Sequence, residues 1–415
     1  MPRGLGDIAD LRLEVIQNFV ETFMAPPELF LQQIFAASQS PSSTIKWESK
    51  RGGRGMTPFV PPGSPAPEIY PLGVAAHNAE AAYWKEKMYL DEEFLNNLRK
   101  EGTESEYLSS QARLARELAQ LVNRSQRRKE WMFAKMMFAG TFTYSIKGGV
   151  KFTVDYDLPS THSVTLGTDY KWQNGTSRNI ISDIITGKRL IKQDCGGTVD
   201  YAVCNSTVLQ YIAQDPSLLT LLQKSAFGQG DLFKSVDNRL VGVNTKVLGS
   251  LLDIDHFVIY DEQYEVRAYL TGAVTADSTV AISVDDAADF EVAESLVFVD
   301  TSAGSDETET IDSISIEDGT VTVSTAPSTS YKAGEDYVRM TKYFVPSDKF
   351  TMFASRVDGQ PIAEYKEAPF GLARRWGNFT DQHEEWDPEG VYIRTQDKGL
   401  PVLYQRDAVY ILDVN

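Results

Sequence analysis

The segment YLSSQARLARELAQLVNRSQRRKEWMFAKMMFA, residues 107–139, contains no glycine and no proline, and it decides how the rest of the chain is interpreted. Its apolar residues recur at the three- to four-residue spacing of one helix face. They are Leu108, Leu114, Leu118, Leu121, Val122, Trp131, Met132, Met136 and Phe138. The pattern predicts one helix of about 33 residues, which would span about 50 Å. Because a small domain is narrower than that, the helix must leave its own core at one end or support a flat molecule.

Four cations lie close together within this predicted helix, namely Arg124, Arg127, Arg128 and Lys129. Like charges on neighbouring turns repel one another, so we expect acidic groups nearby. The alternative is a solvated helix face, which needs no partner.

The segment before the helix is dense in glycine and proline. Residues 43–48 alternate in the manner of a strand, and SKRGGRGMTPFVPPGSPAPEIYPLG follows at 49–73. This composition excludes a helix or a central strand. We predict a long two-stranded loop that projects from the body and is basic at one end through Lys50, Arg51 and Arg54. An unpaired β-loop is a liability unless it is covered, so its exposure predicts that another subunit receives it.

The N-terminal residues predict an arm with an apolar stripe, not an independent domain. Helical spacing of apolar residues at 11–23 is ended by Pro26 and Pro27, and a short apolar piece follows at 29–35. A further helix is predicted over 81–99, ending near Gly102.

Residues beyond the long helix predict a mixed α/β body. Two strand-like runs at 141–146 and 150–156 flank a glycine turn and indicate a hairpin. Helices and strands then alternate up to residue 265. We expect helices at 179–193, 207–213 and 216–223, strands at 201–204 and 257–260, and three C-terminal strands at 391–393, 402–404 and 408–414.

Residues 271–336 break this composition. The window holds 15 acidic residues and one lysine, a net charge of about −14 out of −18 for the whole chain. Short alternating runs rich in Val, Ile, Ser and Thr predict strands at 280–284, 296–299, 311–316 and 321–325. We predict a small all-β barrel or sandwich that interrupts the α/β body, because strand-like sequence resumes at 342–345.

The sequence does not favour enzymatic chemistry. Four histidines are scattered among unlike segments and are interpreted as surface or turn residues, and the two cysteines, Cys195 and Cys204, fit neither a redox pair nor a zinc knuckle. Asp285 and Asp286 are a poor acid–base pair, since adjacent strand residues point to opposite faces. We expect no cofactor, no metal site, no signal peptide and no membrane span, and a net charge of −18 disfavours wrapping nucleic acid over the whole surface.

Four segments, in this order, resemble the major capsid protein of tailed bacteriophages, specifically the lambda-like capsid protein E family with the Hong Kong 97-type fold. SKRGGRGMTPFVPPGSPAP at 49–67 is similar to the extended loop of that family, and residues 109–143 are similar to its spine helix and the exit into the first strand. Residues 257–264 and 344–352 resemble the two strands of a body hairpin. GVYIRTQDKGLPVLYQRDAVYILDV at 390–414 resembles the closing strands of the peripheral domain.

The resemblance implies an α+β, Hong Kong 97-like capsid fold with an inserted small all-β domain, which plainer family members lack. It divides the chain into an N-terminal arm (1–40), an extended loop (41–80), the spine helix and peripheral domain (81–172), an axial domain in two parts (173–270 and 337–384), the acidic β-insertion (271–336) and peripheral C-terminal strands (385–415).

The resemblance also implies a viral structural protein and no enzyme. Copies would form hexamers and pentamers of an icosahedral shell around double-stranded DNA, with scaffold, portal and decoration proteins as further partners and only weak, non-specific contact with DNA. The assembly residues would be Lys50, Arg51, Gly52, Gly53, Arg54, Pro58 and Phe59 in the loop. Arg124, Arg127, Arg128 and Lys129 would lie at a subunit contact or face the DNA.

Three rival interpretations stay open at this point. An encapsulin-like compartment would share the fold but enclose protein. A tail-associated or carbohydrate-binding protein would use the acidic β-domain as its binding part. A hydrolase would use carboxylate pairs such as Asp285 and Asp286.

Overall fold

The computed structural model describes residues 29–50, 74–91, 104–145, 150–174, 177–224, 244–302, 306–386 and 389–415, with isolated residues between 56 and 68. The helix predicted within 11–23 lies outside the described residues. So do the loop residues Arg51, Gly52, Gly53, Arg54 and Pro58.

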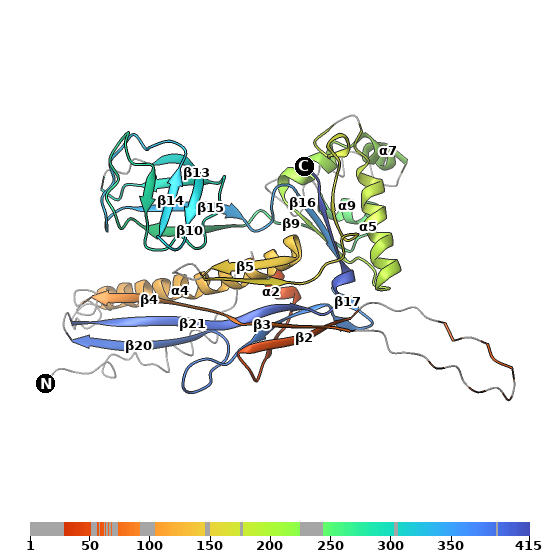
Figure 1. The fold of residues 1–415 in the computed structure, drawn as a ribbon, viewed down its shortest axis with the longest axis horizontal. Coiled ribbons are helices and arrows are strands. Elements are labelled where there is room, and N and C mark those ends of the chain that lie inside the picture. Colours follow the sequence, from red (N-terminus) through yellow and green to blue (C-terminus); the bar gives the residue numbers. More distant parts are fainter. Residues whose placement is uncertain are drawn as a thin grey trace.

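The long helix is confirmed. It is α4 (Glu104–Ala139), 36 residues, and it lies across the molecule above an extended sheet (Figure 1). Its last turns are buried almost all round, as expected for a helix that is apolar on every side. Gly140, at φ +68°, ends it, because a Cβ there would lie 2.4 Å from Leu158 Cδ1 and the left-handed backbone favours glycine.

One face of α4 packs on a five-stranded sheet, named here the peripheral sheet. Its strands are β1 (Ala37–Gln39), β4 (Ala82–Asp91), β19 (Ala363–Glu367), β20 (Phe379–Trp386) and β21 (Glu389–Leu403). The central strand β21 pairs antiparallel with β4 on one side and with β19 and β20 on the other.

Two sequence predictions are wrong in this sheet. Residues 82–91 form the strand β4, not part of a helix, and their side chains alternate between exposed and covered as in a strand with one solvated face. Residues 391–393 and 402–404 are not separate strands but parts of the single strand β21, whose polar middle is paired on both sides.

A second five-stranded sheet, named here the axial sheet, has the order β7-β22-β16-β8-β9. Its strands are β7 (Ser163–Thr165), β8 (Tyr201–Cys204), β9 (His256–Ile259), β16 (Lys349–Phe353) and β22 (Val409–Asp413). The helices beside it are α5 (Ile180–Asp194), α6 (Ser206–Ala213), α7 (Pro216–Lys224) and α9 (Thr245–Leu252), with the short turns η3 (Thr168–Tyr170) and η4 (Arg406–Ala408). Helices α5, α6 and α7 and strands β8 and β9 confirm the sequence prediction, with Asn205 capping α6 through Val208 N.

The sheet membership of four strands differs from the predicted domain boundaries. Strand β22, placed by sequence among the peripheral strands of 385–415, pairs with β16 in the axial sheet, and β7, placed in the peripheral segment 81–172, pairs there with β22. Strands β19 and β20, placed in the axial segment 337–384, belong to the peripheral sheet. The remaining boundaries stay predictions.

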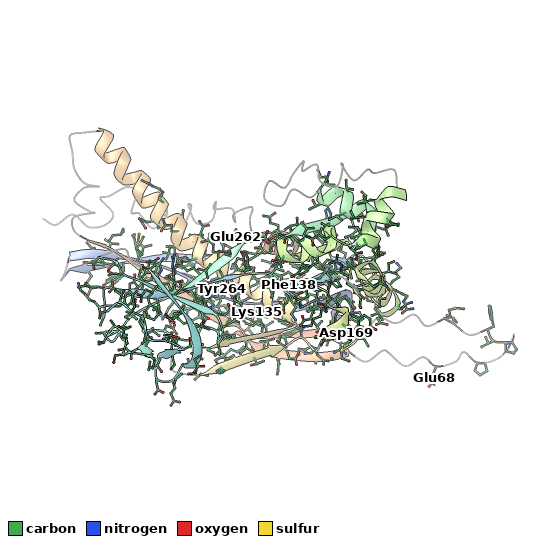
Figure 2. All side chains as sticks on the ribbon, turned by 90° about the horizontal axis from the view of Figure 1, so that it is seen from above. Glu68, Lys135, Phe138, Asp169, Glu262 and Tyr264 are labelled. Atoms are coloured by element: carbon green, nitrogen blue, oxygen red, sulfur yellow. The ribbon has the colours of Figure 1, made fainter. Side chains whose placement is uncertain are left out.

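Three two-stranded pairs complete the body: β2 (Thr44–Lys50) with β3 (Val74–Glu80), β5 (Thr141–Ser145) with β6 (Lys151–Asp155), and β17 (Arg356–Val357) with β18 (Gln360–Pro361). The β5–β6 hairpin confirms the sequence prediction. Strands β2 and β3 pair over seven residues and form the base of the predicted loop. Figure 2 shows Glu68, between them in the chain, far from the body.

The acidic segment forms a closed β-domain with its own core. Its strands are β10 (Gln263–Tyr269), β11 (Ala281–Ser283), β12 (Ser295–Val299), β13 (Glu307–Ser315), β14 (Thr320–Val323) and β15 (Tyr337–Tyr343). They pair in the order β10-β15-β12-β13-β14-β11, and a bridge between Leu270 and Val284 joins the two ends. Among the described residues, its apolar cluster is separate from that of the body. The barrel prediction is confirmed, and closure removes the exposed edges.

The attachment of this β-domain differs from the expected body hairpin. Strands β9 and β16 do not pair with each other, because β8 lies between them. The ends of the β-domain meet instead through its own strands, with Gln263 opposite Tyr343 and Phe344 N donating to Glu262 O. The inserted unit therefore includes β10 and β15 and spans 263–343.

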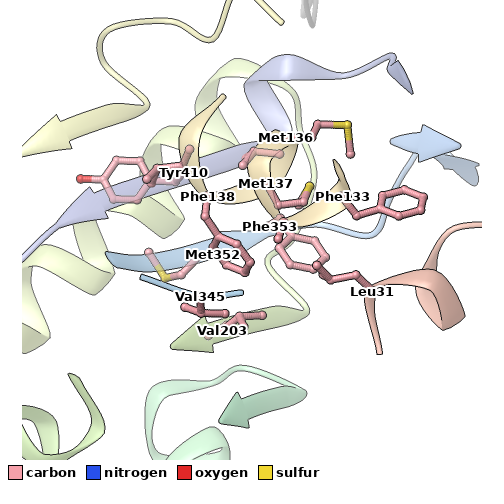
Figure 3. Packing of buried hydrophobic residues seen from close by; sticks show 14 of the residues in the cluster. Leu31, Phe133, Met136, Met137, Phe138, Val203, Val345, Met352, Phe353 and Tyr410 are labelled. Atoms are coloured by element: carbon pink, nitrogen blue, oxygen red, sulfur yellow. The ribbon is translucent and has the colours of Figure 1, made fainter. Parts of the chain in front are cut away.

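The body core forms where α4 crosses both sheets (Figure 3). Met136, Met137 and Phe138 of α4 are buried with Met352 and Phe353 of β16. The described part of the N-terminal arm joins this core. It contains α2 (Leu31–Ile34), and its buried apolar residues are Leu29, Leu31 and Phe35.

A fully buried carboxylate, Glu130, fixes the arm to α4. It accepts hydrogen bonds from Leu31 N at 3.0 Å, Gln32 N at 3.2 Å, Gln32 Nε2 at 3.1 Å and the Tyr260 hydroxyl at 2.8 Å. These donors include the amide groups at the start of α2, which have no partner within the helix. Burial raises the pKa of Glu130, although the four hydrogen bonds act in the opposite direction.

We expect Glu130→Ala to lower the free energy of unfolding by at least about 3 kcal/mol, because several buried donors lose their acceptor. Glu86→Ala, which removes a half-exposed partner of Arg124, is the matched control and should cost less than about 1 kcal/mol. Urea unfolding of the unassembled subunit measures both. Equal losses in the two variants would contradict the structural role of Glu130.

The raised pKa of Glu130 also predicts a pH effect. The folded state holds a proton on this group more tightly than the unfolded state, so its contribution to stability is full below the ordinary glutamate pKa and is lost as pH rises through the folded pKa. Glu130→Gln removes this titration. Between pH 7 and pH 5 the native chain should therefore gain stability relative to Glu130→Gln, and a constant difference would contradict the assignment.

Candidate assembly and interaction surfaces

The four clustered cations of α4 all have acidic partners within the chain. Arg124 Nε lies 2.7 Å from Glu86 on β4, and Arg127 lies 3.9 Å from Glu262 at the start of the β-domain connection. Lys129 and Arg128 pair with Asp397 and Asp289, respectively. The expectation of acidic groups nearby is confirmed, and these groups come from three different parts of the fold.

Lys129 and Asp397 form a buried ion pair between α4 and β21. The ammonium lies 2.6 Å from the carboxylate, whose side chain is fully buried, and 4.9 Å from the ring centre of Tyr365. A buried charge without its partner is strongly destabilising, so each residue requires the other. The side chain of Lys129 therefore lies mostly inside the subunit.

A separate group of ion pairs holds the β-domain against α4. Arg128 Nη1 donates to Asp289 Oδ1 at 3.1 Å, and Lys135 Nζ donates to Glu291 Oε1 at 3.0 Å. Lys342 of β15 lies 2.5 Å from Glu291 and 2.6 Å from Glu294. Although burial acts the other way, the hydrogen bonds from Lys342 and Lys135 hold the pKa of Glu291 below its usual value.

These contacts make the segment 285–294 of the β-domain its docking edge. The two units have separate apolar cores, so the ion pairs and the paired connecting strands hold one to the other. Figure 2 shows Lys135 on α4 and Tyr264 on β10 close together at this contact. The predicted subunit or DNA contact of Arg124, Arg127, Arg128 and Lys129 stays a prediction, and all four carry partners already.

We expect the double variant Arg128→Ala, Lys135→Ala to loosen the β-domain without unfolding either core. Hydrogen exchange should speed up in the segment 285–294 and at the start of β10, by at most about thirtyfold, because the two partly exposed ion pairs contribute at most about 1 kcal/mol each. Lys332→Ala is the control, since its partner Glu335 lies within the β-domain. Unchanged hydrogen exchange in the double variant would contradict the role of these ion pairs in holding the β-domain to α4.

The projecting loop carries exposed apolar side chains. Phe59 is fully exposed, Met56 is 88% exposed and Val60 is 48% exposed. Lys50 is the last residue of β2 and pairs with Val74. Of the seven loop residues predicted for assembly, the structure thus places Phe59 and Lys50, and an exposed apolar group on a projecting segment is typical of an interaction site.

The sequence analysis missed a third surface, on the side of the peripheral sheet that faces away from α4. Lys85 and Lys87 of β4 pair in register with Gln396 and Arg394 of β21, and Lys398 continues the row opposite Tyr83. We name Lys85, Lys87, Arg394 and Lys398 the cationic sheet face. The signal was the two-residue alternation of YWKEKMYL at 83–90, which the helix prediction concealed.

The residues weighed for catalysis have structural surroundings. His162 lies in a turn, as predicted, but it is fully buried there, with its ring nitrogens 2.9 Å from Asp194 Oδ2 and 3.0 Å from Val409 O. Asp285 accepts a hydrogen bond from Tyr269 N, in a structural role. Cys204 is a buried core residue as predicted, and burial raises the pKa of its thiol.

Within the described ranges, groups of three or more His, Cys, Asp or Glu side chains placed to hold a metal ion do not occur. A helix long and apolar enough to cross a membrane is likewise missing from the part of the chain that the structure describes.

Comparison with known families decides among the interpretations. The family model described as phage major capsid protein E matches residues 14–293, more than half of the chain. The chain belongs to this capsid protein family. The matched segment includes the loop, α4 and the first two strands of the β-domain, β10 and β11.

Solved structures show the same fold for this capsid protein. A phage-related protein from Bordetella bronchiseptica RB50 matches with a TM-score of 0.52 at 9% identity, covering 96% of each chain. A candidate capsid protein of a prophage from E. coli CFT073 matches with a TM-score of 0.50 at 12% identity, covering 95% of each chain. A search of curated proteins gives no match. The fold is thus the Hong Kong 97-like capsid fold, as the sequence resemblance predicts.

An encapsulin of Synechococcus elongatus PCC 7942 is a weaker likeness, with a TM-score of 0.39 at 7% identity over 94% of this chain and 91% of that one. A likeness at this level carries no argument about what the shell encloses. The family match instead identifies a phage capsid subunit that builds the shell of the virion.

Proposed function

We propose that this capsid protein forms hexamers and pentamers of an icosahedral shell that encloses double-stranded DNA, and that assembly takes place in the host cytoplasm without catalysis by this chain. The family match over residues 14–293 carries the proposal. The arrangement of α4 along an extended sheet fits the wall of a single-layered shell (Figure 1). Scaffold, portal and decoration proteins would be the further partners.

The projecting loop would join neighbouring subunits. Its base is a seven-residue ladder, which fixes the direction in which it leaves the body. Fully burying a phenylalanine such as Phe59 against another copy would contribute about 1.5–3 kcal/mol. The basic residues Lys50, Arg51 and Arg54 would meet the acidic surface of the neighbour.

We expect deletion of 52–67 to give a folded subunit that does not assemble, because the two cores remain while the apolar contact is lost. Circular dichroism measures folding, and negative-stain microscopy measures assembly. Phe59→Ser is the finer variant and should weaken assembly, whereas Val150→Ser, at another exposed apolar position, is the control. Shells of normal size from the deletion would refute the role of the loop.

The β-domain would lie on the outside of the shell. Its charge of about −12 over 263–343 would be costly next to DNA, since like charges repel within a Debye length of about 8 Å at physiological salt. It docks on the side of α4 opposite the peripheral sheet, so it lies on one face of the flat body.

We expect the subunit to fold when 263–343 is replaced by a short Gly-Ser turn from Glu262 to Phe344, because the β-domain has its own core. Replacing only 271–336 would instead leave buried apolar residues in and next to β10 and β15, such as Leu270, Val338 and Met340, without the rest of their core. This shorter replacement should give a less stable protein. Thermal unfolding compares the two. A remainder that cannot fold after the 263–343 replacement would contradict an independent insertion.

A further inference from the structure

The cationic sheet face gathers positive charge in an acidic chain. Lys85 and Lys87 are exposed on β4, and Arg394 and Lys398 are half-buried beside them on β21. Tyr83, Tyr89 and Tyr392 share this face by register, and Lys87 Nζ lies 4.2 Å from the ring centre of Tyr392. Strand pairing holds these groups in a flat array.

Most of this charge is not neutralised within the subunit. Arg394 pairs with Asp381 of β20, with Nε 2.9 Å from Oδ1. In the part of the chain that the structure describes, by contrast, Lys85, Lys87 and Lys398 take part in none of the ion pairs within 4.0 Å. Three ammonium groups are therefore left to meet an anionic partner or solvent.

The opposite side of the same sheet is occupied. Trp84 Nε1 donates to Ser125 of α4 at 2.9 Å, and Asp397 holds Lys129, so the alternate residues of β4 and β21 face the helix. The acidic β-domain lies beyond that helix. The acidic β-domain and the cationic sheet face thus lie on opposite sides of the layer formed by α4 and the peripheral sheet.

We infer that the cationic sheet face is the surface through which the shell contacts the phosphate backbone of the enclosed double-stranded DNA. The inference rests on the proposed function. Phosphate contacts made by lysine, arginine and tyrosine carry no sequence information, which suits a container for an entire genome. In a single-layered shell the copies lie side by side, so the acidic β-domains of neighbouring copies lie on the opposite side from the cationic sheet face and cannot pair with it. The anionic partner of this face is therefore the enclosed DNA.

The experiment compares two triple variants of the full chain. Lys85→Gln, Lys87→Gln, Lys398→Gln removes the unpaired charges of the face. Lys151→Gln, Lys171→Gln, Lys332→Gln removes equal charge from β6, the segment before α5 and the β-domain. Fluorescence anisotropy with a 30-base-pair duplex of random sequence measures the binding constant of unassembled subunits from about 20 to 200 mM salt. Microscopy scores shells separately.

The face variant should lower the slope of log K against log salt by up to about 2.7, since each neutralised phosphate contributes about 0.9. The control should keep the native slope, and both variants should form normal shells. Equal slopes in all three proteins overturn the inference, as does an equal loss in both variants. Loss of shells in the face variant alone would make the face a contact between copies and also overturn it. Failure of the native chain to form shells would count against the proposed function instead.

Discussion

Two adjacent buried charges on α4, Lys129 and Glu130, connect the main parts of the subunit. Lys129 pairs with Asp397 on the central strand of the peripheral sheet. Glu130 binds the start of α2 in the arm and the hydroxyl of Tyr260, which follows strand β9 of the axial sheet. Burying charge is costly unless each group is paired and hydrogen-bonded. The arm, both sheets and the helix must therefore come together in one arrangement for this turn of helix to be stable.

Charge also separates the two sides of the molecule. Most of the net negative charge lies in the β-domain, whose closed sheet needs no partner for its edges. That domain has its own apolar core and is held to α4 by ion pairs, while Tyr264 of β10 also packs against the body core. An ionic contact of this kind weakens with salt, whereas the body core does not. The same subunit thus combines a body built on one apolar core with a β-domain that is held to it more weakly.

Much of this architecture could be predicted from local pattern. The helix α4 lacks Gly and Pro over its length, and the runs of the β-domain alternate with period two between clear turns. The failures share one physical cause, which is pairing between distant segments. The charged and aromatic residues of 82–91 form a strand because β21 supplies a ten-residue partner some 300 positions later. Likewise, β22 joins the axial sheet because β16 and β7 pair with it there.

The same distinction, between local pattern and pairing of distant segments, applies to the candidate sites. Phe59 and the loop could be found because composition alone excludes a folded interior for them. The basic cluster could be found as a motif, but its acidic partners could not, since they come from β4, β21 and the β-domain. The cationic sheet face was hidden because its four members come from two strands and share a face only through register.

The strength of the loop contact has a consequence for assembly. One buried phenylalanine contributes about 1.5–3 kcal/mol, which is too little to hold two free subunits together. In the proposed closed shell, however, each subunit would both give a loop and receive one, so the contacts would act together once several copies are in place. Weak individual contacts allow a wrongly placed subunit to leave before closure. A projecting loop with a few apolar side chains such as Phe59, on a body whose charges are already paired inside, suits a shell that must form without error and then stay closed.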